Sequence, residues 1–283
     1  EGFDCIHVLT PPNAHYEAVR KILSAGVAAF VEKPFTLAAA EARELCALAR
    51  TRNVALGVNH NFLMLPGYDR LKEDIAALRL GPVDSVQANW RFPLPPLRSG
   101  PYGLWMLRAP ENILFELGPH LFAFVADILG DMSVGHVTLR HPVEIPGGVR
   151  HYQGWRISGT SGEAAVALDL SLVEGQEDRS LELRGVGGLA SFDFGADIYA
   201  CRRPVTGDIV TGPLFSQLGE AARLSAQAFQ NAARQAASLN ALAPFGLSLA
   251  RAVQSFYGAL KARAAPDPRL SGELAARVID MIE

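Results

Sequence analysis

Three short apolar runs, separated by helix-like segments, constrain the fold of this chain more than any other feature. They cover residues 5–9, 27–31 and 54–58. Uninterrupted apolar runs of this length are typical of strands that are buried on both faces of a parallel sheet. The short connections and the helix-like spacing between the runs indicate helices packed on that sheet. The first 80 residues therefore predict a parallel α/β domain.

The helices expected between these strands have recognisable ends. Asn13 and Thr36 are residues of the kind that cap helix N-termini, so we expect Asn13 to start the first helix and Thr36 the second. Gly26 follows the first helix at a position where a left-handed residue commonly ends one. A third helix is expected over about residues 67–78.

The pattern changes near Gly81. Residues 83–91 alternate between apolar and polar, as a half-buried antiparallel strand does. A helix is expected over residues 112–129, after which strand-like and turn-like segments repeat and the C-terminal part becomes helical and alanine-rich. We therefore predict a first domain over residues 1–80 and a second, α+β domain over residues 81–283 with a mostly antiparallel sheet.

Composition and charge exclude several functional classes. The 283 residues carry a formal net charge of −3 and contain no basic run, which argues against nucleic-acid binding. The three cysteines are far apart and form no CxxC pair, so no metal site is expected, and scattered thiols fit the reducing cytoplasm. No apolar stretch approaches the ~20 residues that a membrane span needs. We therefore expect a cytoplasmic protein that binds neither nucleic acid nor membranes.

Polar or rigid residues follow each of the three predicted strands. The three segments are Thr10-Pro11-Pro12-Asn13, Glu32-Lys33-Pro34 and Asn59-His60-Asn61. Ligands of open α/β sheets bind at the carboxyl ends of the strands, because those ends meet at one edge. Taken alone, each segment also fits a turn, a helix cap or a solvated surface pair. Together they predict one crevice lined by all three.

Lys33 is the strongest candidate for chemistry in this crevice. A lysine that is partly desolvated and lies beside a cationic ring has a lowered pKa. It could then exchange a proton with a substrate hydroxyl near neutral pH. Pro34 stiffens the backbone after it, and the bond between the two residues is a candidate for the cis form.

A second candidate pair is Glu116 and His120. In a helix these positions lie on one face, so the carboxylate could orient the histidine and complete a proton relay with Lys33. The alternative is a histidine that is merely buried and hydrogen-bonded in a helical core. Pro119 complicates the pairing, because the helix could instead begin near this proline and leave Glu116 on the preceding loop.

Arginine and aromatic side chains gather around a proline-rich loop. They are Trp90, Arg91, Arg98, Tyr102 and Trp105. Such a cluster could grip a phosphate or stack on a base or a sugar, so Arg91, Arg98 and Tyr102 are candidate substrate-binding residues. The alternative is that these side chains pack the loop onto the second domain.

These segments together resemble the glucose–fructose oxidoreductase / inositol dehydrogenase (Gfo/Idh/MocA) family. The resemblance rests on the run from Asp4 to His15, on Val31-Glu32-Lys33-Pro34, and on Val58-Asn59-His60-Asn61 with Pro66, in that order and spacing. Gly81-Pro82-Val83 and the stretch from Glu116 to His120 extend it, so that it covers roughly residues 4–130.

The resemblance implies a fold, a reaction and a set of site residues. The fold would be a partial Rossmann-type parallel sheet followed by an α+β domain with an open, mostly antiparallel sheet, through which the protein would form homo-oligomers. The reaction would be hydride transfer between NAD or NADP and a secondary alcohol of a sugar, cyclitol or nucleotide sugar. Lys33, His120 and Glu116 would be catalytic, and Lys33 and His120 would also contact the substrate. The cofactor-binding residues would be Thr10, Pro11, Pro12, Asn13, His15, Glu32, Lys33, Pro34 and Asn61.

The sequence also departs from the family pattern. The GxGxxG loop of the family is absent, and we expect the strands that carry it to precede Glu1. Glu116, Ala123 and Leu63 stand where many members have aspartate, aspartate and arginine. A second hypothesis is therefore a non-catalytic member that acts as a binding or assembly subunit.

Overall fold

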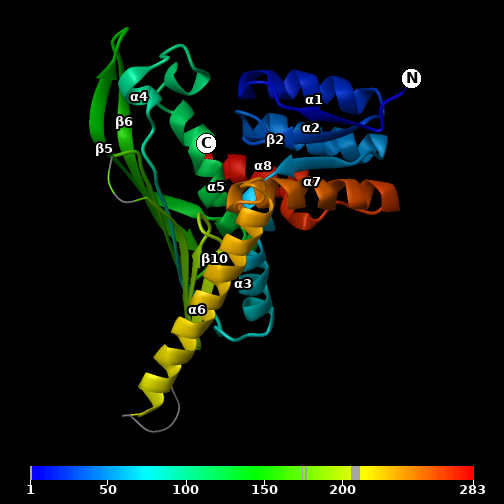
Figure 1. The fold of residues 1–283 in the computed structure, drawn as a ribbon. Coiled ribbons are helices and arrows are strands. Elements are labelled where there is room, and N and C mark those ends of the chain that lie inside the picture. Colours follow the sequence, from blue (N-terminus) through cyan, green and yellow to red (C-terminus); the bar gives the residue numbers. More distant parts are fainter. Residues whose placement is uncertain (1, 174, 176, 205–210) are drawn as a thin grey trace.

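The chain folds around two sheets, a small one and a large one, with helices packed against both (Figure 1). The computed structural model describes residues 2–173, 175, 177–204 and 211–283. The strands are β1 (Cys5–Val8), β2 (Ala28–Glu32), β3 (Leu56–Asn59), β4 (Val83–Arg91), β5 (Ser133–Ile145), β6 (Val149–Ser161), β7 (Ala164–Ser171), β8 (Asp178–Gly185), β9 (Gly188–Asp193) and β10 (Ile198–Arg202). The helices are α1 (His15–Ser24), α2 (Ala39–Arg52), α3 (Pro66–Ala76), α4 (Pro96–Ser99), α5 (Asn112–Ile128), α6 (Thr211–Ala237), α7 (Pro244–Ala262) and α8 (Gly272–Ile282).

The small sheet has the order β1-β2-β3, and all of its strands are parallel. The register pairs Val8 with Val31 and Glu32 with Asn59, so the three strands end at one edge. This confirms the predicted parallel α/β sheet. The apolar runs form it because strands covered on both faces need apolar side chains on both.

The helices beside this sheet begin differently from the prediction. Asn13 caps nothing with its side chain: it lies in a 3₁₀ turn, and α1 begins two residues later at His15. Thr36 donates its hydroxyl to the carbonyl of Ala38, while the N–H of Ala39 donates to a carboxylate oxygen of Glu283 at 2.9 Å. A side chain distant in sequence thus satisfies the helix end that Thr36 was expected to cap. Gly26 has a positive φ, as expected.

The C-terminal helices α7 and α8 return to the small sheet. Phe256 of α7 stacks on Phe30 of β2, with ring centroids 4.8 Å apart, and α8 packs on the opposite face of the sheet together with α2. Gly57 of β3 allows this approach, because a Cβ there would lie 2.5 Å from the Phe256 ring. The domain boundary at residue 80 stays a prediction. Helices α7 and α8 belong to the predicted second domain, yet they pack on the sheet of the predicted first domain.

The large sheet has the order β10-β9-β8-β4-β7-β6-β5. The pair β4–β7 is parallel, and the other neighbouring pairs are antiparallel, which confirms a mostly antiparallel sheet. Along β7 and just beyond it, Val166, Leu168, Leu170 and Leu172 are buried, as their spacing predicts. They join the largest apolar core of the chain, together with α5 and α3.

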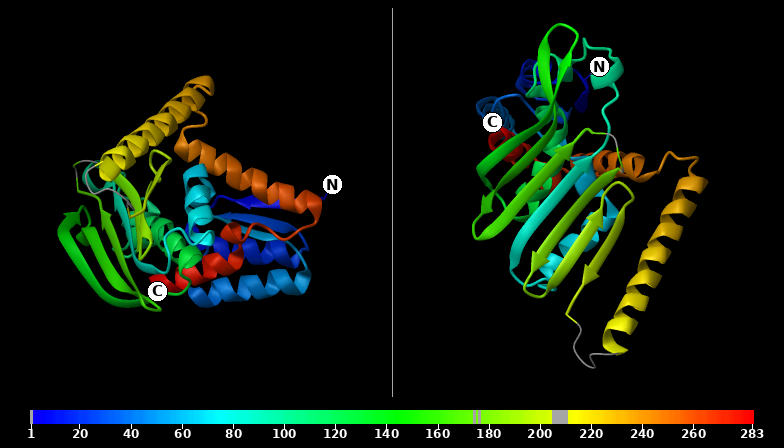
Figure 2. Two further views of the ribbon diagram at one scale, coloured as in Figure 1. Left: turned by 90° about the horizontal axis from the view of Figure 1, so that it is seen from below. Right: turned by 90° about the vertical axis from the view of Figure 1, so that its left-hand side faces the viewer.

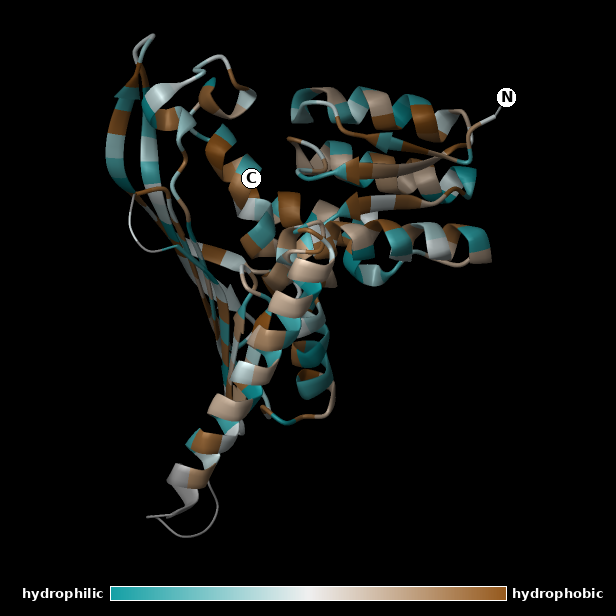
Figure 3. Cartoon of the chain, viewed as in Figure 1, coloured by the Kyte–Doolittle hydropathy of each residue, from teal (hydrophilic) through white to brown (hydrophobic). Residues whose placement is uncertain are grey.

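One face of the large sheet is covered and the other is open. Helix α5 lies between the two sheets, and the opposite face of the large sheet is uncovered in the right-hand view of Figure 2. Hydrophobic residues are concentrated on α5 and at the sheet face that it covers (Figure 3). Helix α6 runs along the β10 edge of the large sheet. Within the described residues, no helix is both long and apolar enough to cross a membrane.

Candidate active site

Lys33 stands directly after β2, at the edge of the small sheet where the strands end. Its Nζ donates to the backbone oxygen of Glu116 at 2.8 Å and pairs with Oε1 of the same residue at 2.5 Å. The two side chains are 14% and 23% exposed, so the ion pair is largely shielded from water. The Lys33-Pro34 peptide bond is cis, as anticipated. Helix α5 therefore brings a carboxylate from the second part of the chain to the predicted proton-transfer lysine.

Glu116 does not orient His120. Helix α5 runs unbroken from residue 112 to 128 with Pro119 inside it, which confirms the helix predicted over residues 112–129 and excludes the alternative start near Pro119. The Glu116 carboxylate is taken by Lys33, and no hydrogen bond joins Glu116 to His120 in the described part of the chain. The ion pair with Lys33 offers the carboxylate a full opposite charge, which the neutral histidine cannot match.

His120 is held by aromatic rings. It is 7% exposed, stacks on Trp90 with centroids 5.0 Å apart and an interplanar angle of 9°, and meets Phe62 edge-on. Burial, followed by the positive charge of Lys33, holds the pKa of His120 well below its usual value. His120 is therefore a neutral imidazole near Lys33, as a proton acceptor at this site would need to be.

His60, the residue after β3, is a site residue that the sequence reasoning did not single out. It is 3% exposed, and neither of its ring nitrogens has a hydrogen-bond partner among the residues that the structure describes. Burial and the nearby Lys33 charge lower its pKa to about 4. The available signal was its position at a strand end, because a polar residue there faces the same crevice as Lys33. An unpartnered buried imidazole is costly, so it points to a ligand or a proton path.

Glu32 lies beside Asn59 across the β2–β3 pair. The Asn59 amide Nδ2 donates to Oε1 of Glu32 at 2.8 Å, and Oδ1 of Asn59 is buried with no partner in the described part of the chain. This orphaned acceptor lies at the strand-end edge, where the family would hold the nicotinamide end of NAD(P). The donor and acceptor groups present therefore fit that group: Glu32 and Asn59 offer oxygens to hydroxyl or amide hydrogens.

The other predicted cofactor residues divide into two sets. Thr10, Pro11 and Asn13 are exposed on the loop after β1, with Pro12 half-buried, and this loop lies at the edge where the strands end. His15 is buried, with Nε2 2.7 Å from the Thr10 carbonyl and Nδ1 2.8 Å from the Pro34 carbonyl. His15 therefore links the segments that follow β1 and β2. Asn61 donates to Ser248 of α7 at 2.8 Å, so its amide secures α7 rather than facing the crevice.

Arg91 does not join this site. Successive residues of a strand point to opposite faces, so Trp90 reaches His120 whereas Arg91 lies on the open face of the large sheet. There it donates to Asp169 at 3.1 Å. Tyr102 donates to the backbone oxygen of Arg98 at 2.8 Å; Arg98 lies in α4 and Tyr102 on the segment that follows it, before α5. Their role toward a substrate stays a prediction.

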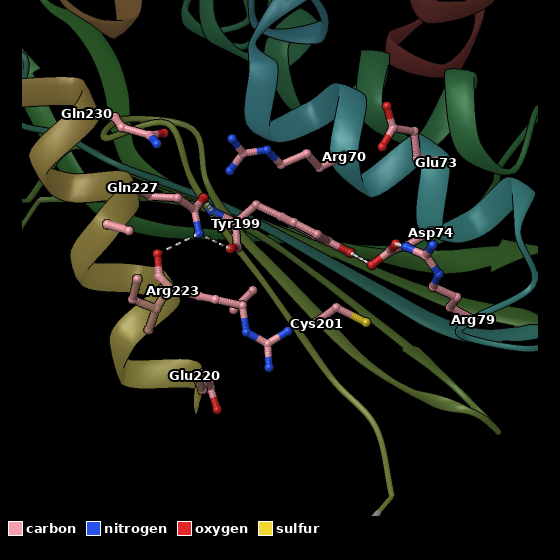
Figure 4. A pocket seen from close by; sticks show the side chains of 13 residues that line it. Arg70, Glu73, Asp74, Arg79, Tyr199, Cys201, Glu220, Arg223, Gln227 and Gln230 are labelled. Atoms are coloured by element: carbon pink, nitrogen blue, oxygen red, sulfur yellow. Dashed lines mark hydrogen bonds and ion pairs between the residues drawn. The ribbon is translucent and has the colours of Figure 1, made fainter. Parts of the chain in front are cut away.

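A separate cavity of about 370 Å³ lies between α3, β10 and α6 (Figure 4). At its wall Tyr199 donates to Asp74 at 2.7 Å, and Asp74 also pairs with Arg79. None of the strand-end residues described above lines it. Asp74 is thus already paired with Arg79, and the residues predicted from the sequence lie elsewhere, so the candidate active site is the strand-end edge around Lys33.

The geometry places a shielded lysine–glutamate ion pair at the strand ends of a Rossmann-type parallel sheet. Residues 1–60 match the sequence profile of the oxidoreductase family with an NAD-binding Rossmann fold. The Gfo/Idh/MocA resemblance predicted from the sequence is thereby confirmed for this part of the chain.

Individual relatives agree in fold and in part of the sequence. The chain is 32% identical over 148 residues to an uncharacterised oxidoreductase of Schizosaccharomyces pombe, covering 51% of this chain and 39% of that protein. It is 27% identical over 163 residues to 1,5-anhydro-D-fructose reductase of Ensifer adhaerens, covering 53% and 48%. A levoglucosan dehydrogenase solved with NADH and levoglucosan superposes with a TM-score of 0.76 at 14% identity, over 99% of this chain and 76% of that one. The chain thus spans less than half the length of these two sequence relatives.

Proposed function

We propose that the protein transfers hydride between NAD(P) and a secondary alcohol of a sugar-like substrate. The observation that carries this proposal is the shielded ion pair of Lys33 and Glu116 at the end of β2, beside two neutral buried histidines. NAD(P), when bound, supplies the hydride acceptor or donor. The residues of the chain must then handle the proton, because oxidation of an alcohol releases one hydride and one proton.

Lys33 is the group that exchanges this proton. Its Nζ is held between the backbone oxygen and the carboxylate of Glu116, which fixes the side chain and leaves a route by which the proton can pass to Glu116. His120, neutral and stacked on Trp90, presents an imidazole that can accept a hydrogen bond from a substrate hydroxyl. Lys33 and His120 would thus hold the reacting alcohol, with Glu116 positioning the lysine.

Several observations support NAD(P) at the strand-end edge. Glu32, Asn59 and the exposed loop after β1 border this edge, and the acceptor Oδ1 of Asn59 has no partner. These residues would hold the nicotinamide riboside portion. A sugar-like substrate is supported by the relative that reduces 1,5-anhydro-D-fructose. The apolar side chains packed around His120 suit a site from which water is excluded.

The experiment is a steady-state assay of the full protein with NAD⁺ and NADP⁺ and a panel of cyclic sugars, anhydrosugars and cyclitols. A Lys33→Met variant is expected to lose about 10² to 10⁴ of kcat/KM, the usual contribution of general acid–base catalysis. Lys72→Met is the matched control, because Lys72 pairs with Asp127 away from the crevice. Wild-type protein that binds neither cofactor and turns over no substrate would instead favour the binding or assembly subunit.

A further inference from the structure

Arg179 of β8 is a charged residue on the covered face of the large sheet. The register places it opposite Trp90 of β4, and residues that face each other in an antiparallel pair point to the same side of a sheet. Trp90 in turn stacks on His120 of α5. Arg179 therefore lies on the side of the sheet that carries the candidate active site. Asp178, its neighbour in the strand, points to the open face together with Arg91.

The guanidinium of Arg179 rests on aromatic rings. Its Cζ lies 5.3 Å from the centre of the Phe92 ring and 6.0 Å from that of Trp90. On another side it packs against Gly195, where an added Cβ would lie 2.9 Å from its Nε. The side chain is 25% exposed, so most of it is removed from water. These contacts fix the guanidinium and attract its charge, but the rings offer no oxygen to its N–H groups.

The hydrogen-bonding capacity of Arg179 is unused. A guanidinium has five N–H donors, and within the described residues the ion pair of Arg179 is with Glu177, which lies 3.9 Å away and is 55% exposed. The carboxylate of Asp193, which borders the same glycine, accepts instead from two backbone N–H groups. On the open face, by contrast, Arg91 donates to Asp169 at 3.1 Å. A shielded cation without an acceptor is unfavourable, so the arrangement favours an anionic ligand.

The other groups at the site leave this positive charge uncompensated. Lys33 and Glu116 neutralise each other in their ion pair. His60 and His120 have lowered pKa values and are neutral near pH 7. The pKa of His120 is lowered by burial first, then by Lys33, and to a smaller extent by Arg179. The field around His120 is therefore positive, which favours a substrate that carries negative charge.

We propose that Arg179 binds an anionic group of the sugar-like substrate, a carboxylate or a phosphate, while Lys33 and His120 hold the reacting alcohol. The inference rests on the proposed hydride transfer and names its substrate class, sugar acids or phosphorylated sugars. His120 and Arg179 both lie within 6.0 Å of the centre of the Trp90 ring, so one sugar ring with a charged substituent can reach both. The guanidinium fork matches two oxygens of either anion, which orients the sugar.

The kinetic test compares each hexose of the activity panel with its uronate and its 6-phosphate. Wild-type kcat/KM is expected to be about 10 to 100 times higher for one anionic form than for the neutral sugar, as hydrogen bonds to a charged group provide. The anion with the larger ratio identifies carboxylate or phosphate as the group bound. Arg179→Met should abolish the preference, and Arg179→Lys, which keeps the charge without the fork, should retain part of it.

The matched control is Arg184→Met on the same strand. Arg184 is 61% exposed and pairs with Glu182, so this variant should keep the wild-type preference. Methionine and lysine both preserve an unbranched stem against the two rings, so both Arg179 variants should fold, which circular dichroism checks. If Arg179→Met does not fold, a reduced preference in Arg179→Lys supports the proposal and an undiminished one overturns it.

A binding measurement separates this inference from the proposed reaction. Calorimetric titration of the full protein with the uronate and the 6-phosphate, with and without NAD⁺ or NADP⁺, needs no turnover. Anion binding that Arg179→Met weakens by about 10- to 100-fold, in a protein that transfers no hydride, would support the anion site and reject the reaction. Turnover of neutral sugars with no preference for either anion, a preference that survives Arg179→Met, or a wild type that binds neither anion overturns the anion site.

Discussion

Helices α5 and α6 flank the same large sheet, yet they meet it in opposite ways. Helix α5 buries Phe122, Phe124 and Val125 in the largest core and directs a carboxylate to Lys33. Helix α6 directs polar groups to the sheet edge and leaves Phe229 exposed. The comparison shows that the hydrophobic residues of α5 are covered by the chain itself, whereas Phe229 of α6 has no such cover among the described residues.

The comparison also separates two kinds of polar residue. On α5, Glu116 is held by the Lys33 ammonium, and His120 by the rings of Trp90 and Phe62. On α6, Gln227 and Asn231 only fasten the helix to backbone groups. A polar residue that remains buried on an otherwise apolar helix is therefore the better indicator of chemistry.

The largest difference between the two helices should appear when one phenylalanine is removed from each. Phe124→Ala on α5 should lower the free energy of unfolding by about 3–5 kcal/mol, because Phe124 is fully buried. Phe229→Ala on α6 should change it by less than about 0.5 kcal/mol in the monomer. Urea unfolding at concentrations that keep the chain monomeric checks both. Equal losses in the free energy of unfolding would mean that Phe229 also packs against the core of its own chain.

A pH titration tests the buried imidazole that faces α5. The pKa of His60 is about 4 in the folded chain, against an ordinary 6.5, so the unfolded chain binds more protons between these values. Stability should therefore be full above pH 6.5 and fall by up to about 3 kcal/mol as the pH drops toward 4. His60→Leu should flatten this loss, and His136→Leu, at an exposed position, should not. If stability depended on pH in His60→Leu as it does in the wild type, the lowered pKa of His60 would not be the cause of the loss.

The ion pair between α5 and the small sheet is tested by kinetics. Glu116→Gln keeps the size of the side chain but removes its charge, so kcat/KM of the full protein should fall by about 10²-fold, with a displaced pH profile. Glu116→Asp should restore part of the rate, because it returns the carboxylate. Glu111→Gln, exposed at the start of α5, is the control. A wild-type pH profile in Glu116→Gln would remove Glu116 from the mechanism.

The smallest effect is expected where α6 meets β10. Gln227→Ala removes both hydrogen bonds to Tyr199, so this edge should open more readily by about 1 kcal/mol, roughly a five-fold loss of protection. Hydrogen exchange of the Tyr199 amide measures it. Gln230→Ala, one turn further along α6, should leave that amide unaffected. Protection that is the same in both variants would show that α6 is held by other contacts.

Local patterns predicted most of the fold, because the signals for strands and turns lie within a few residues. The apolar runs, the strand-end segments and the alternation along β7 all appear where expected. The change of pattern at Gly81 likewise marks the step from parallel to mostly antiparallel pairing. These features depend on periodicity, which a single sequence displays directly.

Partners across the chain could not be predicted in the same way. Glu116 pairs with Lys33, 83 residues away, rather than with His120 four residues on. Asn61 bonds to Ser248 and not toward the crevice, because α7 returns to the small sheet. Arg91 is a different case: strand alternation places it opposite Trp90, so the sequence held the signal that the two cannot share a site. The roles of Lys33, His120 and Glu116 in catalysis stay predictions.

The return of α7 and α8 has a consequence for the order of events at the ribosome. The small sheet is made long before these helices, because Phe256 and Ile279, which complete its two cores, come about 200 residues after β3. At 5–20 residues per second, β1 to β3 would wait roughly 10 to 40 s with apolar faces uncovered. A chain stalled before α7 should therefore be a better substrate for chaperones and proteases than one stalled after α8.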